Sequence, residues 1–206
     1  KALRLGYRAQ IRPASLEDFT EASSFLKLYE QTMQRVSAKM SYYFKADYYK
    51  ALCTSTPSGC LFIAYVYAPL QISDAGENED STDVVSSALF MRHGSKFHYH
   101  LSGSDKEHTK NGVNNMLLDT SARFAYEKLG CDIMHLGGGV SDGDGLYLFK
   151  RSVGDIELSW RVGAHVLNRA SFDDLINLRA EAVGKDPSSL KDCSFFPQYR
   201  DSLSGN

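Results

Sequence analysis

The sequence predicts an α+β fold in which helices cover a mostly antiparallel sheet, and three observations support that prediction. Residues 60–68, CLFIAYVYA, are aromatic and β-branched, as expected of a buried strand. Residues 84–92 and 96–102 form two more strand-like runs, joined by a His-Gly-Ser turn, and indicate an antiparallel meander. Residues 112–129 repeat apolar side chains at helical spacing, which predicts a long helix after these strands.

The N-terminal part of the chain has signals for two further helices. Ser15, with Asp18 three positions later, predicts a helix N-cap, and apolar residues follow at helical spacing as far as Met33. The run KADYYKAL indicates a second, short helix at about 45–52.

The C-terminal part is expected to add two strands and one helix. Gly130 predicts the end of the long helix, and residues 131–136 predict a short strand. Residues 156–167 are expected to form a late strand with Trp160 in the core. Ser171 is expected to cap a final helix, and the aromatic tail, FFPQYR, to pack back onto the body of the protein.

We expect one domain, 1–206, because no internal repeat and no linker between two cores is visible. Its core would span about 15–170, and the last helix and tail 171–206. Residues 71–83 contain five acidic and no basic residues, which predicts a solvated acidic loop.

Composition excludes several classes of protein. The 206 residues carry 23 basic and 25 acidic side chains, a net charge of −2, which argues against a dedicated nucleic-acid binder. Four scattered cysteines without a CxxC pair argue against a disulfide framework. No apolar run approaches a membrane span, and no signal peptide is visible, so we expect a cytoplasmic protein. The chain opens without Met, which indicates a fragment or a processed product.

Several motifs together resemble the FemABX branch of the Gcn5-related N-acetyltransferase (GNAT) fold. FemABX enzymes build peptidoglycan cross-bridges from aminoacyl-tRNA. The resemblance covers about 19–167, and its motifs are FLKLYEQTM at 25–33 with the aromatic residues of 42–49, YHLSGS at 99–104, the helix 117–130, and the Gly-Gly pair 137–138 followed by LYLFK at 146–150 and Gly154.

This resemblance implies an acyltransferase that moves an aminoacyl or other acyl group onto an amine of a small molecule or a cell-wall precursor. It implies no tightly bound cofactor, and it favours aminoacyl-tRNA as the donor, with acetyl-CoA or another acyl-CoA as the second choice. The alternatives are an acetyl-CoA-dependent N-acetyltransferase and an inactive GNAT-like binding module.

The sequence departs from the family pattern in two ways. FemABX enzymes contain two such domains and only one is visible here, so an upstream domain is missing or two chains pair as a homodimer. Residues 108–114 also lack the Arg/Gln-x-x-Gly-x-Gly/Ala signature with which CoA-dependent members bind pyrophosphate. Lys110 and the amides after Gly112 could still bind a phosphate.

By this resemblance, Phe149 and Lys150 lie at the acyl-transfer centre. Lys150 would stabilise the oxyanion or neutralise a charged group of the donor, and Phe149 would pack against its acyl or ribose part. The alternative is that Lys150 is an exposed strand lysine. Tyr99 would orient the amine, or else belong to the core.

Strand alternation places Tyr99 on one face with Phe97 and Leu101, and His98 on the other with His100. His100 is a candidate general base, because imidazole titrates near neutral pH. A zinc site is not expected, since only His135 or a distant Asp could add a ligand to His98 and His100.

The glycine-rich loop is expected to form part of the donor site. Its candidate residues are Gly137, Gly138 and Asp144, with Ser104 at the end of the preceding strand motif. A dinucleotide site is excluded because G-x-G-x-x-G is absent and no helix is expected after these glycines. A calcium loop is excluded because the later ligands, including a terminal Glu, are missing. A plain turn remains the alternative.

Overall fold

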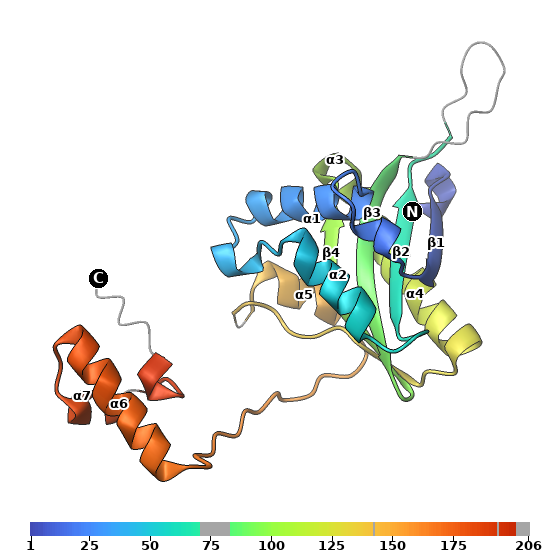
Figure 1. The fold of residues 1–206 in the computed structure, drawn as a ribbon. Helices are drawn as coiled ribbons and strands as arrows, with labels where there is room; N and C mark the ends of the chain where they lie inside the picture. Colours follow the sequence, from blue (N-terminus) through green and yellow to red (C-terminus); the bar gives the residue numbers. More distant parts are fainter. Residues whose placement is uncertain (71–82, 142, 193, 201–206) are drawn as a thin grey trace. The chain divides into compact units, whose positions relative to one another are not determined.

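A five-stranded sheet in the order β1-β2-β3-β4-β5 forms the centre of the first part of the chain (Figure 1). The strands are β1 (Arg8–Pro13), β2 (Leu61–Tyr67), β3 (Val84–His93), β4 (Lys96–Ser104) and β5 (Ile133–His135). Neighbours from β1 to β4 are antiparallel, and β5 runs parallel to β4. The predicted α+β class and the three strands of the meander are therefore confirmed.

This computed structural model describes residues 1–70, 83–141, 143–192 and 194–200. The predicted acidic loop, 71–83, lies outside the described residues except for Asp83. No helix in these ranges is long and apolar enough to cross a membrane.

The chain divides into two compact units, 1–156 and 157–206, which differs from the single domain with a core at 15–170 that we expected. The first unit includes β1, which the sequence pattern did not reveal. β1 is an edge strand with several exposed polar residues and Pro13 at its end. Edge strands tolerate such residues, because one side of their backbone needs no partner strand.

Helices cover both faces of the sheet (Figure 1). They are the short 3-10 helices η1 (Leu3–Leu5), η2 (Leu16–Phe19) and η3 (Met40–Tyr42), and the α-helices α1 (Ser24–Arg35), α2 (Ala46–Ser55), α3 (Lys106–Thr109), α4 (Val113–Leu129) and α5 (Gly145–Val153). One apolar cluster packs η2, α1 and α2 against the sheet, and a second packs α4 against the other face. The predicted long helix and the second short helix are both present.

The predicted first helix is interrupted. Ser15 and Asp18 form the expected capping box, but it caps only the short helix η2. The chain then leaves the helical conformation at Thr20, and Ser23 caps α1 by accepting a hydrogen bond from the amide of Leu26.

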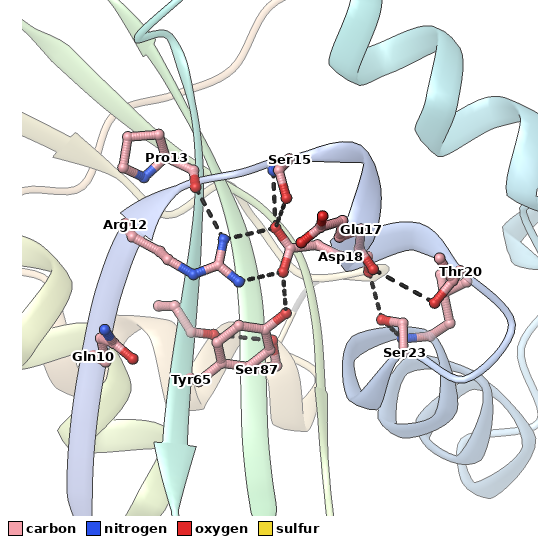
Figure 2. A network of polar contacts seen from close by, with 12 residues as sticks. Gln10, Arg12, Pro13, Ser15, Glu17, Asp18, Thr20, Ser23, Tyr65 and Ser87 are labelled. Atoms are coloured by element: carbon pink, nitrogen blue, oxygen red, sulfur yellow. Dashed lines mark hydrogen bonds and ion pairs between the residues drawn. The ribbon is translucent and has the colours of Figure 1, made fainter.

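A buried ion pair ties η2 to the first two strands (Figure 2). Asp18 is only 5% exposed and accepts two hydrogen bonds from the Arg12 guanidinium, at 2.8 and 2.5 Å. The Tyr65 hydroxyl donates to the same carboxylate at 2.8 Å, as does the amide of Ser15. Burial opposes ionisation of Asp18, but these hydrogen bonds outweigh it and lower its pKa.

A β-bulge in β4 corrects our assignment of side chains to the two faces. Leu101 pairs with Leu89 and Tyr99 pairs with Phe90, so His100 is an extra residue in β4. The bulge shifts the alternation by one position. Tyr99 therefore packs on the α4 side, whereas Leu101 packs on the α1 and α2 side.

Lys150 is a helical residue, which corrects both the strand alternative and the expectation that no helix follows the glycines. Residues 145–153 form α5 because Asp144 caps its first turn. Phe149 and Lys150 are half-buried in this helix, whereas Leu146 and Leu148 are exposed.

The second unit contains α6 (Arg169–Val183), α7 (Pro187–Lys191) and η4 (Gln198–Arg200). Phe172, Ile176 and Leu190 form its core, and Phe196 of the tail stacks on Phe172. The cap of α6 is Asn168, whose side chain accepts a hydrogen bond from the amide of Ser171, so the predicted capping residue was wrong.

The predicted late strand at 156–167 is absent from the described structure, and Trp160 is 87% exposed rather than buried. A strand needs a neighbouring strand to satisfy its backbone groups, and this segment has no such neighbour in the unit 157–206. Its apolar pattern alone therefore does not form a strand.

Candidate active site

The edge of β4 opens where its pairing with β5 ends. His98 and His135 form the last pair of the two parallel strands. From Tyr99 to Ser104, β4 has a partner strand only on the β3 side in the described structure. Backbone groups of Tyr99 to Gly103 on the side away from β3 are therefore available to a ligand, whereas the amide and carbonyl of Ser104 bond side chains of α1.

Lys150 reaches this edge from α5. Its Nζ donates a hydrogen bond to the carbonyl oxygen of Gly138 at 2.8 Å and lies 5.6 Å from the ring centroid of Tyr99. Burial lowers the pKa of Lys150, while the carboxylate of Asp144 partly opposes that shift. The structure thus brings Tyr99, Gly138 and Lys150 together, as the sequence prediction required.

Phe149 and Gly137 complete this arrangement. Phe149 is half-buried against the apolar cluster under α4, so it anchors α5 to the body of the unit. Gly137 has φ of 71°, and a Cβ atom there would lie 3.6 Å from Nζ of Lys150. A side chain at position 137 would therefore be strained by the backbone conformation, although its Cβ would make only an ordinary van der Waals contact with the amine.

Asp144 builds the glycine-rich loop. Its carboxylate accepts hydrogen bonds from the amides of Tyr147, Val140 and Ser141, at 2.7, 2.6 and 2.9 Å. These hydrogen bonds lower the pKa of Asp144, and the bond from the amide of Tyr147 contributes most. A Cβ at position 139 would overlap this carboxylate, which explains a glycine there. Asp144 thus has a role in shaping the loop.

Tyr99 presents its ring to Lys150. The hydroxyl donates to Oγ of Ser102 at 2.5 Å, and burial raises the pKa of the phenol. The bulge puts Ser102 on the same side of β4 as Tyr99, which simple alternation would not have done. In this arrangement the Tyr99 ring supports the lysine, while its hydroxyl is held by Ser102.

His100 lies on the opposite side of the same strand and contacts α2. Its Nε2 is 2.8 Å from the hydroxyl of Tyr48. His100 is exposed as a residue, yet packing around the ring lowers its pKa. The sequence predicted His100 as a candidate base but did not single out Tyr48. The sequence held one signal for Tyr48, namely the adjacent pair Tyr48-Tyr49 in a predicted helix. Neighbouring helix residues point in different directions, so the two tyrosines cannot both face the core in the same way.

Two other predicted donor residues lie beyond this cluster. Ser104 is buried, and its amide donates to Thr32 of α1 while its carbonyl accepts from Arg35, so its backbone joins β4 to α1. Lys110 is exposed in the turn between α3 and α4, at the opposite end of β4 from β5. Gly112 follows with φ of 83° and precedes the first turn of α4.

His98 and His135 are cross-strand neighbours, with ring centroids 5.4 Å apart. Burial first, and then the neighbouring cationic groups, lower the pKa of His98. Within the ranges that the structure describes, no group of three or more His, Cys, Asp or Glu is arranged to hold a metal ion.

Comparison with known proteins assigns this arrangement to a family. Residues 1–151 match the family described as acetyltransferase (GNAT) domain. The chain belongs to this GNAT family. The matched residues include the sheet, α4, the glycine-rich loop and Lys150.

Solved structures share the GNAT fold at low sequence identity. An aminoglycoside acetyltransferase from an uncultured soil metagenomic sample, crystallised with sisomicin, is 12% identical over 81% of this chain and 99% of that protein, with a TM-score of 0.52. A possible acetyltransferase from Clostridium difficile 630 is 14% identical over 78% of this chain and 99% of that protein, with a TM-score of 0.53. No curated protein sequence matches the chain.

FemX is also similar in fold, with 16% identity and a TM-score of 0.56. The match covers 72% of this chain and 50% of FemX, so the GNAT chain described here corresponds to half of that protein. The predicted resemblance to the FemABX branch is therefore confirmed for the fold.

Proposed function

We propose that this chain transfers an acyl group from an acyl-CoA to a primary amine, and the position of Lys150 carries the proposal. Its ammonium group lies beside Tyr99, the first residue of β4 beyond the last pair with β5. Membership of the GNAT acetyltransferase family supports acyl transfer as the class of reaction. The donor, the acceptor and the residue roles given below are parts of this proposal.

The chemistry joins the amine nitrogen to the carbonyl carbon of a thioester. The nitrogen lone pair forms the C–N bond as the carbonyl π electrons move onto oxygen. The tetrahedral intermediate then collapses, the C–S bond breaks, and the CoA sulfur leaves with that electron pair. The amine gives up one proton, which a base accepts and the leaving thiolate or solvent takes up.

Lys150 would stabilise the oxyanion of that intermediate. An ammonium group has three N–H donors, and the Gly138 carbonyl engages one of them. The remaining donors are held in place by the contact with the Tyr99 ring. Partial burial strengthens electrostatic interactions at this position, because the local dielectric constant is lower than in water.

The unpaired part of β4 suggests a path for the donor. Five residue steps from Tyr99 to Ser104, at about 3.3 Å each, span about 17 Å. Lys110 and the N-terminus of α4 follow that end of the strand, where positive charge and backbone amides favour a phosphate. A long donor with a phosphate at one end and an acyl group at the other fits this layout.

Aminoacyl-tRNA is the second candidate donor. The FemX fold covers 72% of this chain with a TM-score of 0.56, and residues 108–114 lack the usual pyrophosphate signature of CoA-dependent members. The acceptor in either case would be an amine on a small molecule or a cell-wall precursor.

The test measures release of CoA thiol from acetyl-CoA in the presence of an amino sugar, an aminoglycoside or a peptide with a free α-amine. We expect Lys150→Met to lower kcat about 100-fold, with the melting temperature unchanged. Lys50→Met, at an exposed position of α2, is the matched control and is expected to retain full activity.

Binding by calorimetry separates the donors. Binding of CoA supports the leading proposal, whereas transfer from aminoacyl-tRNA without CoA binding supports the second candidate. If neither donor binds, the chain is a binding module and the proposal is wrong. If Lys150→Met keeps full turnover, Lys150 has no part in the mechanism.

A further inference from the structure

Tyr48 and His100 form a specific polar pair on the face of the sheet opposite Lys150. Oη of Tyr48, in α2, lies 2.8 Å from Nε2 of His100, in β4, although 52 positions separate the two residues in sequence. His100 is the extra residue of the β-bulge, between the pairs Leu89–Leu101 and Phe90–Tyr99. Strand alternation places His100 opposite Tyr99, on the α2 side, and the bulge keeps Leu101 on that side as well.

The tyrosine ring is held on two sides. It stacks on Phe44, with centroids 4.3 Å apart and planes at 19°, and meets Tyr49 edge-on at 5.2 Å. Tyr49 is fully buried, so this contact fixes Tyr48 to the core under α2. The hydroxyl therefore has a defined position before any ligand binds, which reduces the entropy lost on binding.

The protonation states favour a hydrogen bond from tyrosine to histidine. Burial raises the pKa of Tyr48 and lowers that of His100, so at neutral pH the phenol keeps its proton and the imidazole is neutral. Burial is the only resolved cause of either shift, so no charged side chain among the described residues is needed to explain them. Nε2 is then the acceptor, and Nδ1 carries the ring proton.

From this geometry we propose that Tyr48 is a proton-relay residue, which passes the proton of the acceptor amine to His100. The inference rests on the function proposed above. The Tyr48 hydroxyl contacts Nε2 of His100. A proton that leaves the acceptor amine would therefore reach Nε2 through the oxygen of Tyr48.

The relay conserves protons and charge. As the amine nitrogen bonds to the acyl carbon, its N–H proton moves to Oη of Tyr48, and the N–H bonding pair stays on nitrogen. The former hydroxyl proton of Tyr48 moves at the same time to Nε2 of His100, which becomes an imidazolium. The proton later returns through Tyr48 to the departing thiolate.

The relay also explains how the site uses both faces of one strand. Tyr99 and His100 are consecutive in β4, so strand alternation places their side chains on opposite faces. Lys150 would act on the acyl oxygen from one face, while Tyr48 would receive the proton of the amine from the other.

The first test does not depend on activity. In protein labelled with ¹⁵N-histidine, we expect neutral His100 to carry its proton on Nδ1 in the wild type. Tyr48→Phe should shift that population toward the Nε2–H form, while Tyr43→Phe, in the same aromatic segment, should leave it unchanged. A wild-type His100 with its proton on Nε2 would overturn the relay.

The second test measures the pH profile of kcat/KM with acetyl-CoA and the best amine of the panel. We expect Tyr48→Phe and His100→Gln each to lower kcat about 100-fold, with little change in the KM for acetyl-CoA. The double variant should lose no more than either single variant, because the two residues act as one unit. Both variants should also lose the acidic limb of the profile.

Two other results would reject the proton relay. If Tyr48→Phe changes the tautomer but retains kcat, the pair is structural and the relay is wrong, while the proposed function stands. If the wild-type protein transfers no acyl group to any amine, the proposed function fails and the relay fails with it.

Discussion

Replacing Asp18 with Asn is expected to lower the free energy of unfolding by about 3 kcal/mol, because it removes the charge from a buried ion pair. The carboxylate accepts hydrogen bonds from Arg12, Tyr65 and Ser15 (Figure 2). Both of its oxygens are surrounded by donors, so the NH₂ group of Asn must face a donor in either orientation.

The magnitude follows from the burial of the two partners. Breaking a buried pair by neutralising one partner costs about 3–5 kcal/mol, since the other charge is left without compensation. The side chain of Asp18 is 4% exposed, but that of Arg12 is 39% exposed, so water can partly hydrate the guanidinium. The lower end of the range is therefore expected. Tyr65→Phe, which removes a single donor, should cost about 1.5 kcal/mol.

Urea denaturation at several pH values provides the assay. The native pKa of Asp18 lies below the ordinary value of 3.8, so the pair contributes its full stabilisation above pH 3.8. That contribution is lost as the pH falls through the native pKa, and the difference between wild type and Asp18→Asn should shrink there. Asp119→Asn is the control, because Asp119 pairs with Arg123 on the exposed surface of α4 and its loss should change stability little. A loss for Asp18→Asn no larger than that of the control would refute the reasoning.

Three further predictions concern the close contacts and the exposed segment. Gly103→Ala should destabilise the protein by about 2 kcal/mol in urea denaturation, because its Cβ would overlap the α1 backbone at Leu28, whereas Gly163→Ala, in open space, should be neutral. Asp144→Ala should accelerate hydrogen exchange of the Val140, Ser141 and Tyr147 amides, and unchanged rates would contradict its role in the loop. Trp160 is the single tryptophan, so its emission and iodide quenching should match those of free N-acetyltryptophanamide, and a blue-shifted, protected signal would contradict its exposure.

The sequence predicted the elements whose signals lie within one continuous run of residues. The aromatic run at 60–68 became β2, and Gly130, with φ of 63°, ends α4 as predicted. These signals are local, since they depend on residues within one element. β1 was missed because its partner, β2, lies about 50 residues further along the chain and because half of its own residues are polar.

The errors arose where a contact between distant elements decides the local structure. One extra residue in β4 reversed the faces of Leu101 and Ser102 relative to Tyr99, and no composition signal marks that residue. The run at 156–167 has the apolar alternation of a strand but forms none within its own unit. Periodicity predicts which residues a strand would bury, while strand formation itself requires a partner.

The candidate site follows the same rule. The resemblance correctly brought Lys150 near Tyr99, and the sequence named His100 as a base, but the partners that define their chemistry come from elsewhere. The sequence named Gly138 as a donor-site residue but not as the acceptor of the Lys150 hydrogen bond, and it did not name Tyr48, which contacts His100. The β-bulge determines what surrounds Tyr99 and His100, because it turns Ser102 to the Tyr99 side of β4 and Leu101 to the α1 and α2 side. If the bulge were removed by deletion of one residue at position 100, Leu101 would take the place of His100 and the base would be lost. A strand of regular geometry would still place Tyr99 and His100 on opposite faces, but it would turn Ser102 away from the Tyr99 hydroxyl and Leu101 toward the α4 side.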